Sequence, residues 1–439
     1  MLKSVHLKNF KLHEDTTIEA APITVFIGPN NTGKSSVFQA LLALKQAAAR
    51  NTSEANYFLQ QALRQSPSPG HPFLFEDNRL IDIGQFADVV RRDLSQVEIG
   101  VSGTASSPRP SKEIGPLEVH FDAAIAENVL ASHEGNIRFS KGRFAWRYVS
   151  SAPRAFPQPF IKVEDCVLKF EVLGTFHFIQ SDGLDVAPGR SPELVSSVAQ
   201  IAQTLASAPV QLLISLHPIF PLRGFEEWGY PSPQFPGANL ERLALTDRAV
   251  ALASTLASNY KLRKDVSERL QELLNIGIEI ETVGPDRVKI YATSDGKSGS
   301  VTLFSNEGTG ANQLPFILVP IALTPKNDTL LLSEPEAHLH PKGQCNLTRV
   351  LLTVAKKENI QFFIETHSEH VLHVILNAVG RGDWAKDDVA LHYFENVEGT
   401  TKVKQLGINE HGQVDGGLPG FFDQSLAELT EFLDALKKT

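Results

Sequence analysis

Apolar positions near the start of the chain predict a strand, a glycine-rich loop and a helix in succession. Residues 5–10 alternate as a strand that turns at its end, and residues 23–27 form a continuous apolar run. The loop at residues 28–35 follows directly, and the apolar residues within 37–44 then fall on one face at helical spacing. The order strand, loop, helix is typical of a phosphate-binding unit.

The middle of the chain predicts short antiparallel strands and then helices. Loop-forming residues cover 66–70, 102–116, 151–159 and 218–236. Alternating segments at 117–123 and 167–178 predict strands, and helical spacing covers 194–205 and 240–274. No heptad pattern continues long enough to predict a coiled-coil arm.

From residue 276 onward, strands return and then alternate with helices. Strands are expected at 278–283, 288–292, 301–304, 330–332, 360–364, 391–394 and 403–408, and a closing helix at 426–436. Strands that alternate with helices indicate a parallel α/β sheet. No internal repeat is visible.

The overall composition fits a packed soluble protein. The chain has 439 residues, 42% of them hydrophobic, a net charge of −9 and two distant cysteines, Cys166 and Cys345, that match no metal or redox spacing. The most membrane-like run, residues 314–323, is too short for a span and contains two prolines. We therefore expect a cytoplasmic protein without membrane contact.

The negative net charge speaks against general attraction to nucleic acid, which needs a local basic patch. Two basic clusters are candidates, one within residues 141–147 and one within 261–264, and each is also typical of a solvated face. Contact with DNA through the middle of the chain therefore stays open.

Three segments carry recognisable chemistry, and the first is the loop at residues 28–35. It fits G-x-x-x-x-G-K-[ST], in which glycines turn backbone N–H groups toward phosphates at a helix N-terminus. Lys34 is expected to reach the β- and γ-phosphates, and Ser35 to offer its hydroxyl to Mg²⁺. The predicted ATP contacts in this segment are Gly28, Pro29, Asn30, Asn31, Thr32, Gly33, Lys34, Ser35 and Ser36.

The second and third segments follow buried strands. The sequence SEPEAHLHP at residues 333–341 follows an apolar strand, the usual place where a P-loop enzyme holds its metal and attacking water. The sequence ETHSEH at residues 365–370 follows the next strand, and its His367 can bond a γ-phosphate or the attacking water. These histidines include no H-E-x-x-H and pair with no cysteine, so a zinc site is not expected.

Together these segments resemble the ABC-type ATPase head of the OLD, RecF and SMC/Rad50 proteins, and above all the OLD-like AAA_15 and AAA_21 ATPases found in bacterial anti-phage systems. Residues 306–315 resemble the signature loop of that group, and residues 221–224 and 418–423 are also similar to it. The likeness covers residues 1–45 and about 300–425, whereas the middle matches loosely.

The resemblance implies an α/β P-loop head assembled from N- and C-terminal segments, with a β-rich and then a helical insertion. The expected divisions are 1–105 for the N-terminal part of the head, 106–190 for the β-rich extension, 191–277 for the helical insertion and 278–439 for the C-terminal part. It also implies a homodimer or larger assembly that holds ATP between two heads.

The same resemblance assigns roles to individual residues. Glu334 matches the base that orients water, His367 the switch histidine, and Gln85 a possible glutamine linking Mg²⁺ to the sheet. The signature contacts to ATP in the opposite protomer are Asn306, Gly308, Thr309 and Gly310.

Two positions depart from the pattern of the group. Ser333 stands where an acidic residue usually holds Mg²⁺ through water, and Asn306 stands where a serine is common. A hydroxyl can bind metal-bound water but adds no charge, so weaker metal affinity and slow hydrolysis are expected.

The function expected is that of an ATPase whose assembly controls a separate effector, such as a nuclease or toxin, because no fused Toprim nuclease is visible. Two alternatives stay open: a nucleotide-gated scaffold with negligible hydrolysis, and a RecF-like DNA repair ATPase.

Overall fold

A computed structural model of the chain provides the structure. It describes residues 1–49, 76–77, 80–92, 94–105, 115–127, 129–140, 142–151, 160–163, 166–173, 179–186, 192–221, 223–232, 248–294 and 301–418.

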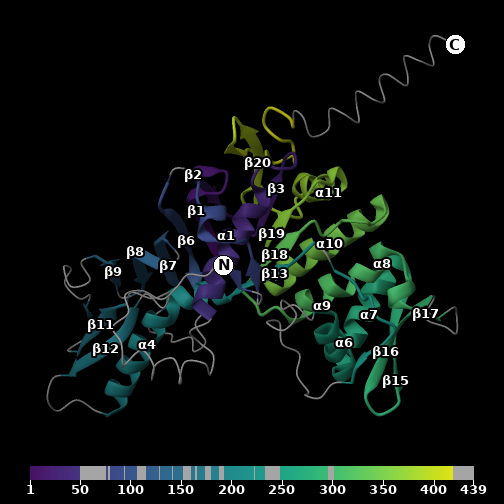
Figure 1. The fold of residues 1–439 in the computed structure, drawn as a ribbon, viewed down its shortest axis with the longest axis horizontal. Helices are drawn as coiled ribbons and strands as arrows, with labels where there is room; N and C mark the ends of the chain where they lie inside the picture. The colour runs from purple at the N-terminus through teal and green to yellow at the C-terminus, as the bar shows by residue number, and fades with distance from the viewer. Residues whose placement is uncertain are drawn as a thin grey trace, which may run out of the picture.

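One six-stranded sheet joins the beginning and the end of the chain (Figure 1). Its order is β13 (Leu216–Ile219), β18 (Thr329–Ser333), β19 (Gln361–Glu365), β3 (Ile23–Ile27), β20 (Val389–Val397) and β21 (Thr400–Leu406). All neighbouring pairs are parallel except the hairpin of β20 and β21. The N-terminal β3 therefore lies between two strands from the last quarter of the chain.

This sheet separates two hydrophobic cores. Alternate residues of a strand point to opposite faces, so Phe26 and Leu331 belong to one core while Val25 and Leu330 belong to the other. The first core includes α1 (Lys34–Ala49) and α4 (Pro192–Ile214). The second includes α9 (Pro315–Leu323), α10 (Pro341–Glu358) and α11 (Glu369–Gly380). Burial on both faces explains the continuous apolar runs in the sequence.

A second six-stranded sheet is antiparallel throughout. Its order is β2 (His13–Glu19), β1 (Leu2–Phe10), β6 (Val97–Ala105), β7 (Leu117–Ala126), β8 (Val129–Phe139) and β9 (Gly142–Val149). A smaller sheet of β10 (Phe160–Val163), β11 (Cys166–Val172) and β12 (Ile179–Val186) follows. Between β3 and β6 lie β4 (Glu76–Asp77), β5 (Ile81–Asp82) and α3 (Phe86–Val89).

Helix α4 contains Val195–Ile214, which is long and apolar enough to cross a membrane by length and composition. In the fold its apolar residues belong to the same core as α1 and the antiparallel sheet, including Val198, Leu205 and Leu212. Burial of these residues is typical of a core helix. The run that was most membrane-like in the sequence, residues 314–323, is a different segment and forms the buried α9 with its N-cap.

The remaining elements before α9 form a helical and β-rich lobe beside α10. They are β14 (Tyr230–Pro231), α6 (Arg248–Ser258), α7 (Tyr260–Leu274), β15 (Ile276–Val283), β16 (Arg287–Ser294), β17 (Val301–Leu303), η1 (Phe304–Asn306) and α8 (Thr309–Gln313). A short turn, η2 (Lys386–Asp388), connects α11 to β20. Asn259 caps α7 by accepting a bond from the Leu262 N–H, so the helical stretch expected to continue to residue 274 is two helices.

The predicted α/β class and the joining of N- and C-terminal segments are confirmed. The predicted loop from residue 102 was wrong in its first part, because β6 runs to Ala105. Strand β6 pairs with β7 along its whole length, so a single sheet crosses the proposed boundary between residues 105 and 106. The expected helix at 426–436 lies outside the described residues, as do residues 419–423.

Candidate functional site

The loop between β3 and α1 has three residues with positive φ angles, a conformation that favours glycine and asparagine. Gly28 and Gly33 have φ angles of 137° and 92°, and Asn31 has a φ of 61°. A Cβ at Gly28 would collide with the carbonyl oxygen of Phe394, so both the φ angle and the close contact require glycine at this position. Pro29 and Asn30 are exposed at the tip of the loop.

Side chains from strands near both ends of the chain hold this loop in place. The Asn396 side chain donates to the Asn31 carbonyl at 3.0 Å, and the Thr401 hydroxyl donates to the Thr32 carbonyl at 2.8 Å. His13 Nε2 lies 3.0 Å from the Gly33 carbonyl and donates to it. Burial lowers the pKa of His13 to about 4, so the ring is neutral near pH 7. The hydrogen bonds fix the loop from three strands.

Lys34 is the cation of the loop. Its ammonium donates to the carbonyl oxygens of Gly28 at 3.0 Å and Pro29 at 2.7 Å, and the residue is 3% exposed. Burial lowers its pKa, and the carboxylates of Glu365 and Glu334 partly oppose that change. A positive charge is thus held inside the turn.

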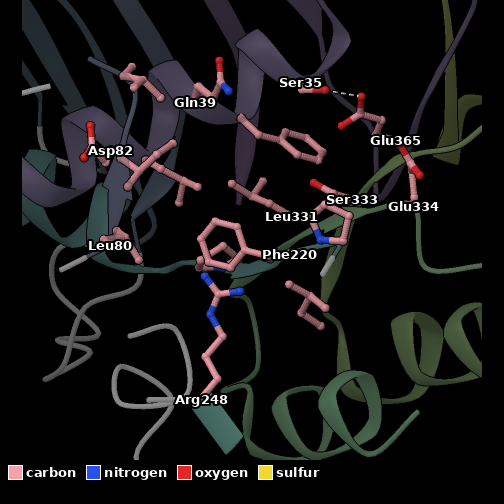
Figure 2. Close-up of a pocket in the computed structure, with 17 residues that line it drawn as sticks. Ser35, Gln39, Leu80, Asp82, Phe220, Arg248, Leu331, Ser333, Glu334 and Glu365 are labelled. Atoms are coloured by element: carbon pink, nitrogen blue, oxygen red, sulfur yellow. Dashed lines mark hydrogen bonds between the residues drawn. The ribbon is translucent and has the colours of Figure 1, made fainter. Parts of the chain in front are cut away.

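Two carboxylates from neighbouring parallel strands face the start of α1. Strands β3, β18 and β19 run the same way, so their carboxyl ends meet at one edge of the sheet. At this edge the Ser35 hydroxyl donates a hydrogen bond to Glu365 Oε1 at 2.5 Å. Figure 2 shows Ser35, Glu365, Glu334 and Ser333 together on one side of a cavity of about 460 Å³.

The backbone of Glu334 is held on both sides. Its φ of 44° lies in the left-handed region, and its N–H donates to the Glu365 carbonyl at 2.9 Å. Arg223 donates to the Glu334 carbonyl at 2.8 Å and to the Ser333 carbonyl at 3.2 Å. Burial lowers the pKa of Arg223 to about 10, which still leaves it charged near pH 7.

Glu336 anchors the segment that carries His367. One of its carboxylate oxygens accepts bonds from the Thr366 hydroxyl at 2.5 Å and the His367 N–H at 3.1 Å. Burial raises the pKa of Glu336 and also that of Glu365, where the Ser35 hydrogen bond opposes the effect. His367 itself reaches solvent, and partial desolvation followed by the charge of Lys34 lowers its pKa. Its imidazole is neutral near pH 7.

The signature-loop residues lie apart from this cavity. Asn306, Gly308 and Thr309 are exposed, and Gly310 packs so closely on the His338 carbonyl that a Cβ there would collide with it. Helix α8, which begins in this segment, lies well away from α1 (Figure 1). Within one chain, these residues do not meet the P-loop.

The structure also places the remaining predicted residues. Ser36 is buried and its N–H donates to the Gly33 carbonyl at 3.1 Å, as part of the first turn of α1. Gln85 is exposed at the N-terminus of α3, where its N–H donates to Asp88 at 2.8 Å. The neighbouring Asp82 is among the described residues that line the cavity, whereas Gln85 is not.

Sequence reasoning missed two contributors to the site. Arg248 lines the cavity, with its guanidinium 3.9 Å above the ring centroid of Phe220 (Figure 2). Arg223 belongs to the segment noted for its resemblance, but its contact with Glu334 lies between residues 111 positions apart. Only the fold reveals that pairing.

The geometry fits a nucleotide with a divalent cation. The turn of Gly28 to Gly33 presents backbone at a helix N-terminus, and Lys34 supplies positive charge for phosphates. Oxygen atoms of Ser35, Glu334 and Glu365 are of the type Mg²⁺ prefers. Because the described residues hold no group of three or more His, Cys, Asp or Glu placed to bind a metal by itself, phosphate oxygens and water would complete the coordination.

Comparison with protein families gave two matches. The family AAA_15, described as an AAA ATPase domain, matches residues 1–98 and 246–372. A family of proteins of unknown function, DUF3696, matches residues 385–432. No match was found among curated proteins.

Solved structures with similar folds include three SMC heads. An SmcHead bound to the C-winged helix domain of ScpA is 13% identical, with a TM-score of 0.46 over 93% of this chain and 98% of that one. The SMC head domain from Thermotoga maritima is 12% identical, with a TM-score of 0.40 over 93% and 99%. The Smc head from Pyrococcus furiosus, bound to a ScpA domain, is 13% identical, with a TM-score of 0.43 over 99% of both chains. At this similarity, the roles of residues rest on the geometry of this chain alone.

Proposed function

Since this chain belongs to the AAA ATPase domain family AAA_15, we propose that it binds Mg²⁺-ATP at the P-loop and hydrolyses it to ADP and phosphate. The observation that carries the proposal is the meeting of Ser35 with Glu365, 330 positions away, beside Glu334 and Lys34. A lysine, a hydroxyl and two carboxylates at one edge of a parallel sheet are the groups that phosphoryl transfer to water requires.

Each residue has a distinct part in the proposed reaction. The loop N–H groups and Lys34 bind the phosphates, and Ser35 serves the metal site. Glu334 accepts a proton from the attacking water. The oxygen of that water bonds to the γ-phosphorus, while the bond from the γ-phosphorus to the β–γ bridging oxygen breaks and ADP leaves. Neutral His367 donates its N–H to the γ-phosphate or the water. Mg²⁺, when bound, neutralises negative charge on the phosphates.

We further propose that ATP is held between two copies of the chain. The exposed Asn306, Gly308 and Thr309 lie away from the P-loop of their own chain, which supports a contact with the nucleotide of a partner copy. In this proposal, closure of two heads in the cytoplasm controls a separate effector protein, such as a nuclease or toxin in anti-phage defence.

A mixing experiment tests the two-copy site. Gly308 has a φ in the ordinary range and open space where a Cβ would lie, so Gly308→Glu preserves the fold but places a carboxylate among phosphates. Gly308→Glu and Lys34→Ala should each lack activity, whereas their mixture should recover up to about one quarter of wild-type phosphate release by statistical pairing. Gly308→Ala serves as the control. A mixture as inactive as its components contradicts the shared site.

Ser333 favours one second candidate, a nucleotide-gated scaffold that binds ATP and turns over negligibly. Ser333 lines the cavity with a side chain that carries no charge. Tight ATP binding with phosphate release no faster than in Glu334→Gln would favour the scaffold over the ATPase.

A further inference from the structure

The carboxylate nearest to the P-loop serine comes from an unexpected strand. Ser333 ends β18, where related ATPases carry an acidic residue, and it is in register with Glu365 at the end of β19. Strand β19 lies between β18 and the P-loop strand β3. The negative charge missing from β18 is therefore present on the adjacent strand, about 4.8 Å closer to the P-loop.

The position of Glu365 is suited to a cation held together with Ser35. Its Oε1 accepts the Ser35 hydroxyl at 2.5 Å, and Ser35 is exposed although Glu365 is only 3% exposed. In Figure 2 the Glu365 carboxylate points at Ser35 and lies beside Glu334 and Ser333. The almost fully buried Glu365 carboxylate therefore lines the cavity beside the exposed Ser35, to which it is hydrogen-bonded.

Several charged groups surround this point. The carboxylates of Glu365, Glu334 and Glu336 act on one another, and the Lys34 ammonium and the Arg223 guanidinium act on them with the opposite charge. Three carboxylates thus face two cations. Because triphosphate adds further negative charge on the side of Lys34, the balance at Ser35 favours a divalent cation.

We propose that Glu365 is the protein carboxylate of the Mg²⁺ site and takes the place of the acid absent at Ser333. This inference rests on the proposed ATP binding. Glu365 would bind the metal directly or through its water, beside the Ser35 hydroxyl. The competing explanation is that Glu365 only accepts the Ser35 hydrogen bond and fixes α1 to the sheet.

Binding of Mn²⁺, followed by electron paramagnetic resonance on ATP-loaded protein, separates the two explanations without measuring activity. Glu365→Gln keeps an acceptor for Ser35 but removes the charge. We expect its Mn²⁺ affinity to fall about tenfold or more, from loss of one charge a few ångströms from a divalent ion. ATP affinity measured in EDTA should not fall, because the substitution removes a negative charge near the phosphates.

Two further variants sharpen the result. Ser333→Asp combined with Glu365→Gln returns a carboxylate to β18 and should restore most of the lost Mn²⁺ affinity. Asp82→Asn, which removes a charge from another wall of the same cavity, should leave it unchanged. If Glu365→Gln does not fold, Glu365→Asp replaces it, and retraction of the carboxylate should still weaken Mn²⁺ binding.

The outcomes are distinguishable. Wild-type Mn²⁺ affinity in Glu365→Gln, or in Glu365→Asp where that variant is used, overturns the proposal and leaves Glu365 as a partner of Ser35 only. Failure of the wild-type protein to bind ATP in the presence of Mg²⁺ would instead refute the proposed function.

Discussion

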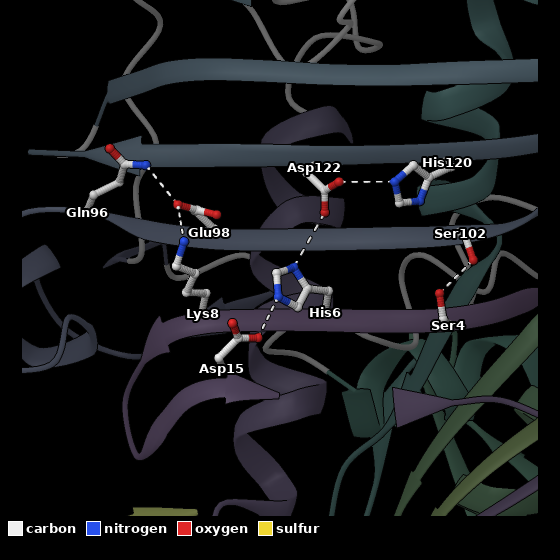
Figure 3. Close-up of polar contacts among 9 residues, drawn as sticks. All are labelled: Ser4, His6, Lys8, Asp15, Gln96, Glu98, Ser102, His120 and Asp122. Atoms are coloured by element: carbon white, nitrogen blue, oxygen red, sulfur yellow. Dashed lines mark hydrogen bonds and ion pairs between the residues drawn. The ribbon is translucent and has the colours of Figure 1, made fainter. Parts of the chain in front are cut away.

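The two six-stranded sheets of this protein place polar residues in opposite ways. In the sheet around β3, strands β3 and β19 are buried throughout, and the charged groups gather where parallel strands end. In the antiparallel sheet, polar residues meet one another along one face (Figure 3). These contacts include His6 with Asp122 and Lys8 with Glu98 between strands, and His120 with Asp122 within β7.

The open face carries His6 and His120 beside Asp15, Asp122 and Glu98, and these groups largely neutralise one another. Lys8 meets Glu98 at 3.2 Å, and both side chains are partly exposed, at 41% and 28%. Exposed ion pairs contribute little to stability. At the parallel edge, Glu365 and Glu336 are buried carboxylates close to Glu334, and Lys34 and Arg223 are nearby cations. Buried charge that is only partly compensated, more than the number of polar residues, marks the site.

The largest effect is expected for Lys34→Ala, which should nearly abolish ATP binding because it removes the side-chain charge within the phosphate loop. Titration calorimetry with a slowly hydrolysed ATP analogue measures this. Lys8→Ala, on the open face of the other sheet, is the matched control and should bind as the wild type does. Equal affinity in both variants would refute the assignment of the phosphate loop.

Glu334→Gln should leave ATP binding intact and slow hydrolysis by roughly 10²–10⁴-fold, the usual contribution of a positioned general base. The amide keeps the shape of the side chain but cannot accept the proton. Phosphate release is the measurement, and an ATP-loaded assembly should accumulate. Glu98→Gln provides the control on the antiparallel sheet. Unchanged turnover in Glu334→Gln would transfer the role of base to Glu336 or Glu365.

The smallest effect is expected for Asp122→Asn, at about 0.5–1 kcal/mol of unfolding free energy near pH 6. Hydrogen bonds to Asp122 raise the pKa of His6 and of His120, against the effect of burial. Burial would raise the pKa of Asp122, but the two histidines together lower it below its usual range.

The sign of the pH dependence follows from these directions. A raised histidine pKa stabilises the fold below the unfolded value of about 6.5 and loses that effect as pH rises through the folded value. A lowered Asp122 pKa stabilises above about 3.9 and loses its effect in stronger acid. Urea unfolding at pH 6 and pH 8 should therefore show a smaller cost of Asp122→Asn at pH 8. A cost that grows toward pH 8 would contradict the pairing.

Local patterns predicted much of the fold and of the site. The apolar strand, glycine turn and helix around Lys34 are contiguous, so their arrangement is readable from the sequence. The partner of Ser35 is different, because strand order and register decide that Glu365 and not Ser333 meets it. Likewise, the contact of Arg223 with Glu334 depends on β13 pairing with β18, which no local pattern encodes.

The position of β3 between β19 and β20 also has a consequence for the time course of folding. During synthesis at about 5–20 residues per second, the 330 positions from Ser35 to Glu365 take roughly 15–65 seconds to emerge. Throughout that interval the apolar β3 lacks both neighbours. The contacts of the loop segment with Glu365, Asn396 and Thr401 also form only after that interval, so we expect the phosphate loop to become ordered late in folding.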